Sequence, residues 1–549
     1  MKCVAKQIYE IIKKNKLLFV LTCLIDVMAY GFYATTYTFN VDQLVPEYYN
    51  GSILITAGRY FSPLIHNVTN WFTFSPFWAT VVMCIFFIFS GLLTAVLINK
   101  ETDNGYTSIS LFLFIMIFES FPAISAQLTY PNINIAISYC VVPIALMILK
   151  PFDNKVSIKG FLLSSLLISF AIDMYESFAP VTLTLFFGLF LLKIFNAKVK
   201  LSFKNDFLLP TIKVAMMLVA GIILEFIVSK SVCKLVSGEF EYWYTENTYI
   251  AWIDSSAGIL RCFKRLLVEL LSFIVIGSAV DLSCFCFTAS VSILFLLAIV
   301  KTVKSKGQNG ILMFLGAVAV TASAKSLQLV TGRLEETRQL QAIPVFCAII
   351  ALLLCENLIK HKYAAFKVAA IAGFVLALSV QTQYMNNVAV KNYERFDYEI
   401  DILKEVRDEL KKYDTENKAV SFAAQEDFEL PEVLTSSDEP PIIAKMYKRF
   451  IYCLWNTCIP ENFGKAEDFE KQYTNNNVTQ WSYISWICGV KRFPVVYRTF
   501  ERLGLKLIQP EVISEIDAEE YIFEKGEEFK IIDNEDEIYV IFGTKSTST

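Results

Sequence analysis

Long apolar runs dominate the first 385 residues of this 549-residue chain and constrain its fold more than any other feature. A helix that crosses a bilayer needs about 20 predominantly apolar residues. Eleven runs approach that length: 17–39, 77–98, 107–129, 133–149, 160–175, 177–195, 208–229, 280–300, 310–330, 342–358 and 364–384. The sequence therefore predicts an all-α polytopic membrane protein. With 55% hydrophobic and 19% charged residues, it excludes a purely soluble enzyme and a nucleic-acid binder with a basic face.

Charge divides the chain into two predicted domains. Residues 386–549 hold 20 Lys and Arg against 32 Asp and Glu, whereas residues 1–385 hold 29 against 21. We therefore expect a membrane domain at 1–385 and a small acidic α+β soluble domain at 386–549. The tail pattern predicts a charged amphipathic helix at 391–413, then strands at Lys418–Phe422 and Glu537–Phe542. Its acidic residues are interpreted as a solvated face rather than a binding site.

Lysine placement predicts the orientation, because cytoplasmic loops of membrane proteins carry the excess of Lys and Arg. Five lysines precede the first span, and the loops after every second span are lysine-rich. The N-terminus is therefore expected in the cytoplasm, and eleven spans place the C-terminal domain outside. Residues 255–271 are expected to form an amphipathic helix in the membrane interface, followed by one span at 280–300. The alternative is two spans at 263–279 and 284–300, which would place the lysines at 301–306 outside.

Charged and aromatic residues collect at the ends of the spans that this orientation places outside. Such groups are costly beside a membrane, so they indicate a functional site. Together these residues have the parts for sugar transfer from a lipid-linked donor: carboxylates for proton transfer, basic side chains for the donor phosphate and tyrosines for stacking on sugar rings. The catalytic candidates are Asp42, Glu47, Asp173 and Glu176; the phosphate-binding candidates are Arg59, Arg333, Arg338 and Lys325; the sugar-contacting candidates are Tyr60, Tyr130 and Tyr175.

Each of these residues also has a structural interpretation. Interfacial tyrosines often anchor a span at the headgroup level. An acid such as Asp42 can be a solvated loop residue, and nearby acids and arginines can pair with each other in water. A transporter or lipid-linked-sugar flippase is the alternative function, although transporters usually bind substrate near the midplane within repeated halves. We find no internal repeat, and the polar groups collect at one face.

The first loop and two later segments resemble a known family. Asp42 is followed by Gly58-Arg59-Tyr60, which resembles the Gly-Arg-aromatic element of the type-II Gtr family of serotype-converting O-antigen glucosyltransferases. Tyr175-Glu176-Ser177 is similar to a Tyr-Gln-small element of that family, with Glu in place of Gln. Tyr521–Gly526 and Glu537–Gly543 resemble its closing pair of strands.

This resemblance implies a GT-C-like membrane glycosyltransferase that uses a polyprenyl-phosphate sugar, often glucose, and acts on a cell-envelope glycan outside the plasma membrane. Asp42 would be the general base and Arg59 would hold the donor phosphate. A partner flippase and a donor-lipid synthase are expected. The resemblance implies no particular cofactor; Asp42 and Glu47 are the two carboxylates that could share a divalent cation.

Overall fold

The computed structural model describes residues 2–36, 55, 59–61, 64–65, 76–124, 133–153, 157–197, 199–236, 259–304, 309–332, 339–425, 442–459, 465–466, 469, 484, 494–510, 518–524 and 527–543. These residues form two compact units. Unit 1 takes its residues from 1–35, 51–387 and 443–477, and unit 2 from 36–50, 388–442 and 478–549. Each unit is described by itself below.

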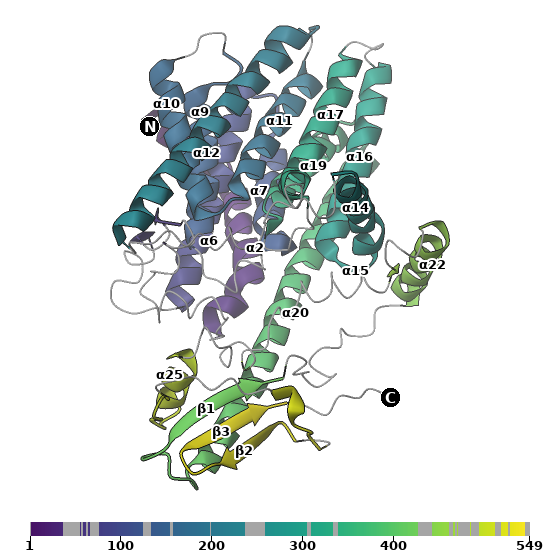
Figure 1. The fold of residues 1–549 in the computed structure, drawn as a ribbon. Helices are drawn as coiled ribbons and strands as arrows, with labels where there is room; N and C mark the ends of the chain where they lie inside the picture. The colour runs from purple at the N-terminus through teal and green to yellow at the C-terminus, as the bar shows by residue number, and fades with distance from the viewer. Residues whose placement is uncertain are drawn as a thin grey trace. The chain divides into compact units, whose positions relative to one another are not determined.

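Unit 1 is a bundle of apolar helices (Figure 1). Its N-terminal half contains α1 (Lys2–Lys14), α2 (Lys16–Thr35), α6 (Pro76–Glu101), α7 (Ser108–Glu119), α9 (Ile133–Leu149), α10 (Ile158–Met174) and α11 (Phe178–Asn196). Then follow η1 (Phe203–Leu208), α12 (Leu209–Val236), α14 (Ile259–Ser272), η2 (Phe273–Gly277), α15 (Ser278–Val280), α16 (Leu282–Lys304), α17 (Gly310–Ala324), α18 (Ser326–Thr331), α19 (Ala342–Ile359), the first part of α20 (Ala364–Leu410) and α22 (Ile442–Cys458).

A helix lies at each of the eleven predicted spans, but their lengths differ. Seven helices in the described part of the chain are long and apolar enough to cross a membrane, and α7, α9 and α17 are shorter apolar helices. The multi-span membrane fold is therefore confirmed, while the count of eleven spans stays a prediction. One predicted span differs in shape, because the run at 310–330 is broken at Lys325 into α17 and α18.

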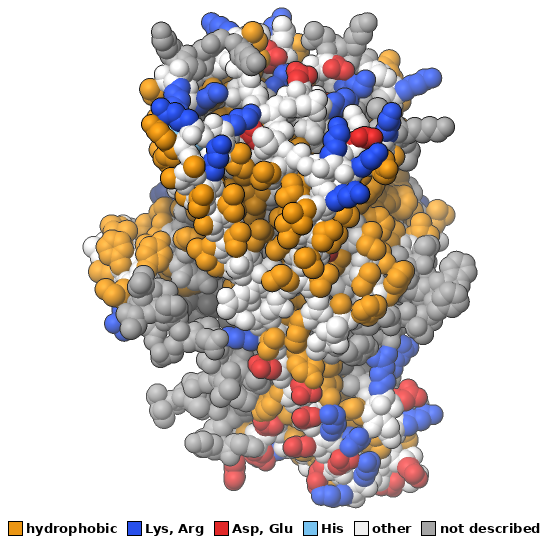
Figure 2. All heavy atoms as spheres, turned by 180° about the vertical axis from the view of Figure 1, so that it is seen from behind, with side chains coloured by type: hydrophobic (Ala, Val, Ile, Leu, Met, Phe, Trp, Pro, Cys, Tyr) orange, Lys and Arg blue, Asp and Glu red, His pale blue; other side chains and the backbone are white. Residues whose placement is uncertain are grey.

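The surface of the helices in unit 1 matches a lipid environment. Figure 2 shows a broad band of hydrophobic side chains with Lys and Arg gathered at one end of it. Exposed apolar residues such as Ile311, Val318 and Leu296 belong to this kind of surface. Helices α6, α11 and α16 carry lysines in their last turns. This segregation is the pattern from which the sequence predicts orientation.

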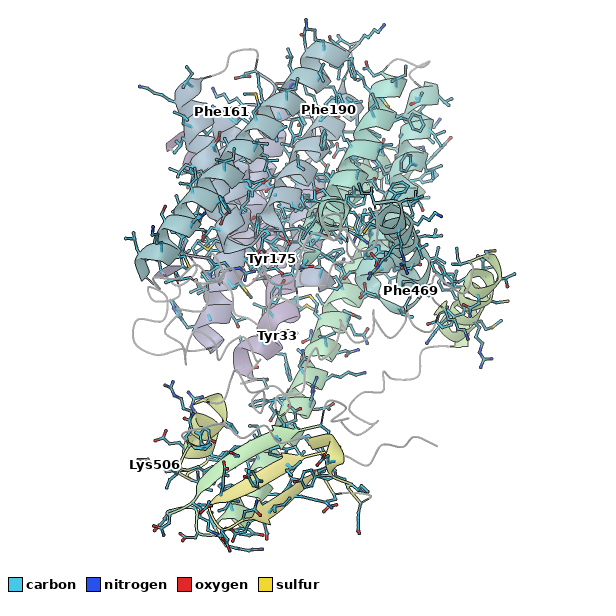
Figure 3. The ribbon with its side chains drawn as sticks, in the orientation of Figure 1. Tyr33, Phe161, Tyr175, Phe190, Phe469 and Lys506 are labelled. Carbon is cyan, nitrogen blue, oxygen red and sulfur yellow. The ribbon has the colours of Figure 1, made fainter. Side chains whose placement is uncertain are left out.

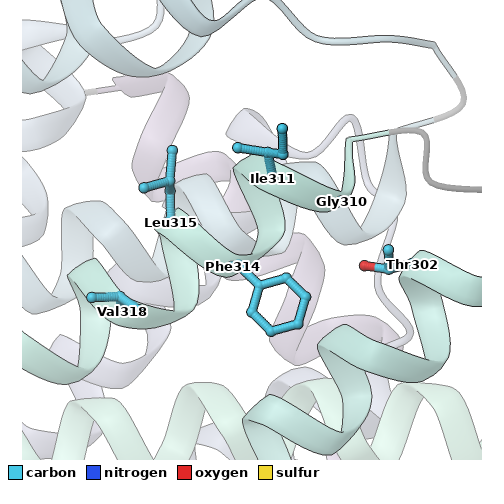
Figure 4. A pocket seen from close by; sticks show the side chains of 6 residues that line it. All are labelled: Thr302, Gly310, Ile311, Phe314, Leu315 and Val318. Atoms are coloured by element: carbon cyan, nitrogen blue, oxygen red, sulfur yellow. The ribbon is translucent and has the colours of Figure 1, made fainter.

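A shallow apolar groove of about 490 Å³ lies between α16 and α17 (Figure 4). Its lining residues are Thr302, Gly310, Ile311, Phe314, Leu315 and Val318. None of them carries a charge, so the groove offers hydrocarbon contact rather than chemistry. It belongs to the apolar exterior of the bundle.

Unit 2 is the small α+β unit that the tail sequence predicts. Strands β1 (Ala419–Ala424), β2 (Phe529–Asp533) and β3 (Glu537–Phe542) form a sheet in the order β1-β3-β2, with β1 parallel and β2 antiparallel to β3. The end of α20, α25 (Pro494–Arg502) and the short η6 (Ala518–Glu520) complete the described elements. The core lies between the sheet and helical residues such as Leu403, Val406 and Phe500.

Two details of the tail prediction were wrong. Residues Tyr521 to Glu524 are not in a strand, and the partner of β3 is the later segment Phe529–Asp533, because the turn Asn534-Glu535-Asp536 closes a hairpin there. The last span and the tail helix are also not separate, since α20 continues through Tyr384 and Lys391 to Leu410. The predicted strands near 418–422 and at 537–542 are confirmed.

Candidate active site

The tip between α10 and α11 carries the first part of the candidate site. Helix α10 ends at Met174, Tyr175 is extended, and α11 begins at Phe178. The amide N–H groups of Phe178 and Ala179 donate to the carbonyls of Tyr175 and Glu176 at 3.1 and 3.2 Å. So short a connection fixes Tyr175 and Glu176 at the common end of the two helices. Figure 3 shows Tyr175 at the opposite end of the helices from Phe161 and Phe190.

The carboxylate of Asp173 binds the backbone of a segment that is distant in sequence, at Tyr60 and Phe61. The N–H of Tyr60 donates to Oδ1 of Asp173 and the N–H of Phe61 to Oδ2, both at 3.0 Å. Asp173 is only 2% exposed, and Phe170, one turn earlier on the same face of α10, packs its ring 4.6 Å from the ring of Phe61. A carboxylate that accepts two successive amide hydrogens fixes the orientation of the segment that carries them.

Arg59 lies next to this anchored segment and faces the helix tip. Its Nη2 is 3.4 Å from both carboxylate oxygens of Glu176, and its guanidinium lies 5.1 Å from the ring centroid of Tyr175. The two charged side chains are 24% and 41% exposed. An ion pair that is long and partly in water contributes little on its own. Glu176 is therefore a partner that another anion can replace.

Glu225 is a further acid near this cluster that the sequence analysis did not single out. It lies on α12, accepts a hydrogen bond from Ser229 at 2.8 Å, and interacts electrostatically with Tyr60, Asp173 and Glu176. Its position inside the apolar run 208–229 was the signal that could have found it, because an acid in a predicted span requires an explanation.

Close packing of two helices brings Glu225 to the site. A Cβ atom on Gly221 would lie 3.2 Å from the backbone oxygen of Ser165 and 3.3 Å from the backbone nitrogen of Ser169. Helices α10 and α12 therefore approach closely one turn before Asp173 and Glu225, respectively.

Burial raises the pKa of the Tyr60 hydroxyl to about 12, and the charge of Asp173 adds to the effect. The Tyr60 hydroxyl therefore stays protonated through the pH range in which an ordinary tyrosine ionises.

Lys325 belongs to a second polar group, formed around the break between α17 and α18. It is 4% exposed, and its Nζ lies 3.9 Å from the ring centroid of Phe273 in η2. Asp281, which caps α16 by accepting the N–H of Cys284 at 2.7 Å, is 5% exposed. Lys325 and Asp281 both interact electrostatically with Cys284. These contacts give Lys325 a structural role at the break between α17 and α18, in addition to the phosphate-binding role predicted from the sequence.

The structure thus brings together part of the predicted set. Arg59, Tyr60, Asp173, Tyr175 and Glu176 form one cluster, which we call the Arg59 cluster. Five other predicted residues lie outside the described residues, so their roles stay predictions: Asp42, Glu47, Tyr130, Arg333 and Arg338. No group of three or more His, Cys, Asp or Glu side chains suited to a metal occurs among the residues that the structure describes.

These features define a polytopic membrane protein with an arginine and several carboxylates gathered at one end of its helices. Residues 31–355, more than half of the chain, match the family model of glucosyl transferase GtrII. The chain belongs to this family, and it is a membrane glycosyltransferase. No match was found among curated proteins. The matched range contains every residue of the Arg59 cluster, and Glu225 as well.

Proposed function

We propose that this glucosyltransferase moves glucose from a polyprenyl-phosphate donor to a cell-envelope glycan on the outer face of the plasma membrane. The observation that carries the proposal is the Arg59 cluster, in which an anchored arginine faces a replaceable carboxylate at the end of a membrane helix pair. A lipid-linked phosphate presents its charge at that depth, where the hydrocarbon chains meet the headgroups.

Arg59 would bind the donor phosphate. Its planar guanidinium can donate two parallel hydrogen bonds to phosphate oxygens, which a lysine cannot do. Donor binding would replace the long contact with Glu176 by shorter charge-assisted bonds. The Tyr175 ring would hold the guanidinium of Arg59 in its orientation. When the glucosyl–phosphate bond breaks, the same side chain would stabilise the charge left on the leaving phosphate.

A carboxylate must accept the proton of the attacking hydroxyl group. Asp42 is our proposed general base, as the family resemblance implies. Glu176, released from Arg59 by the donor, and Glu225 would then lie nearby to orient the acceptor. Asp173 has both oxygens occupied by backbone N–H groups, so we now assign it a positioning role in place of the catalytic role proposed from its sequence.

The partners in this proposal are the lipid donor, the glycan acceptor and the bilayer, together with a flippase and a donor-lipid synthase that deliver the donor outside. Glu47, Lys325, Arg333 and Arg338 remain proposed members of the site, as does Tyr130. A divalent cation held by Asp42 and Glu47 also remains a proposal.

The test is transfer of radiolabelled glucose from polyprenyl-phosphate glucose to envelope glycan, in membranes that contain the protein or its Asp42→Asn variant. We expect label in the glycan with the unaltered protein and a loss on the order of 100-fold in the variant. An Asp153→Asn variant is the matched control, because Asp153 is 61% exposed in a surface ion pair with Lys150. Full activity of Asp42→Asn would exclude Asp42 as the base. Failure with this and other polyprenyl-phosphate sugars would instead favour a flippase.

A further inference from the structure

Helix α22 (Ile442–Cys458) has an exposed apolar face among the residues that the structure describes. Met446, Tyr447, Phe450 and Leu454 are 67%, 44%, 64% and 46% exposed. At 3.6 residues per turn these four side chains fall within about 100° of the helix circumference. The exposed residues therefore form one continuous strip along the helix rather than a scatter of single apolar side chains.

The other face of the same helix is already packed. Trp455 is 2% exposed, and its ring meets that of Phe469 edge-on at 5.4 Å. Asn456 accepts the backbone N–H of Ala466 at 3.0 Å. Ile451 is also buried. The helix therefore has one face committed to its own segment and a second, apolar face available to a partner.

The charge of α22 favours an anionic partner. Its sequence contains Lys445, Lys448 and Arg449 and no acidic residue, although the tail as a whole has 32 Asp and Glu against 20 Lys and Arg. By helical position the three basic residues fall outside the exposed apolar strip. An apolar strip flanked by Lys and Arg is the pattern of helices that lie in the headgroup region of anionic membranes.

Length and context agree with a helix that lies on the membrane instead of crossing it. Seventeen residues with three charges do not make a span, and α22 is not among the helices long and apolar enough to be one. Residues 443–477 group with unit 1, which holds the membrane helices, and not with unit 2.

We propose that α22 is an interfacial helix that binds the anionic surface of the bilayer and tethers the C-terminal tail there. Helix α14 (Ile259–Ser272) has the same construction, with Ile259, Leu260, Phe263 and Leu267 exposed and three basic residues in its sequence. The proposal is independent of the transfer chemistry, so failure of one leaves the other standing.

Cys453 and Cys458 are exposed on α22 and offer a direct test in the full-length protein. The protein is reconstituted in vesicles of phosphatidylcholine with or without phosphatidylglycerol and labelled with bimane. A Cys453→Ser/Cys458→Ser variant gives the background from other thiols. In that variant, Glu501→Cys on α25 places the control label on an exposed residue of unit 2.

We expect nitroxide lipids to quench the α22 labels several-fold more than the control label, with aqueous iodide showing the reverse order. Replacing Lys445, Lys448 and Arg449 with Gln should lower lipid quenching in phosphatidylglycerol vesicles, whereas Lys506→Gln should not. Iodide quenching of α22 equal to that of the control would overturn the proposal. Protection from both quenchers would also overturn it, because the apolar strip would then be covered by protein.

Discussion

Asp173→Asn tests whether the Arg59 cluster works as a unit. Asp173 accepts two amide hydrogens at 3.0 Å, one on each oxygen, and is nearly inaccessible to water. Asparagine has the same shape but only one acceptor oxygen, so its NH₂ group must face one of the two N–H donors. A hydrogen bond to a charged group contributes about 1.5–3 kcal/mol, and the abandoned donor stays buried.

The consequence should be a change in population of the segment that carries Arg59. Each 1.4 kcal/mol is a factor of about ten, so the loss of 1.5–3 kcal/mol lowers the equilibrium constant for the anchored state of this segment by roughly 10- to 150-fold. We expect glucose transfer, measured as kcat/KM for the lipid donor, to fall by up to that factor, which applies in full once the released state predominates. Asp153→Asn, the same exchange on an exposed acid, should leave transfer unchanged.

A double-mutant cycle with Arg59→Ala separates positioning from chemistry. If Asp173 acts only by placing Arg59, then Asp173→Asn should cost almost nothing once Arg59 is gone. If the two losses multiply, Asp173 acts by a route other than Arg59, and our assignment of Asp173 to positioning Arg59 is wrong. Thermal unfolding of the purified protein should be followed in parallel, because a general loss of stability would lower activity equally in both backgrounds.

Four further predictions follow from the same contacts. Arg59→Lys should lower transfer by about tenfold or more, because lysine lacks the planar fork; unchanged transfer would remove Arg59 from the site. Gly221→Leu should lower the melting temperature and the activity together, since added core volume typically costs ~1–3 kcal/mol, and a normal melting curve would contradict the close approach of α10 and α12. Phe500→Ala, in the fully buried core of unit 2, should destabilise that unit by about 3–5 kcal/mol and speed proteolysis of the tail. Tyr60→Phe should leave the pH–rate profile unchanged around pH 10.0, the ordinary tyrosine pKa, because the Tyr60 hydroxyl stays protonated until about pH 12.

Much of the fold could be predicted because the membrane imposes a simple rule. Apolar length located a helix at each of the eleven predicted spans, and the alternating pattern of Glu537–Phe542 located β3. Boundaries were less accessible. The fusion of the last span with the tail helix leaves no breaker residue to find, since the junction around Tyr384–Lys391 contains neither Gly nor Pro. The partner of β3 was predicted wrongly, because the tight turn that begins at Asn534 pairs β3 with Phe529–Asp533 and not with the earlier segment near Tyr521.

The site shows where prediction from a single sequence stops. Topology places Arg59, Asp173 and Glu176 at one face, but it does not say that Asp173 holds the backbone of the arginine segment while Glu176 holds its side chain. Glu225 was harder still, because α12 packs on α10 across an intervening helix in the sequence. That contact depends on Gly221, which has no side chain to register in a hydropathy pattern. The carboxylates of the site therefore come from two places: Asp173 and Glu176 from the tip between α10 and α11, and Glu225 from α12. The identity of the residue that takes the proton must be decided by measuring transfer in their variants, since residue type alone is the same for all of them.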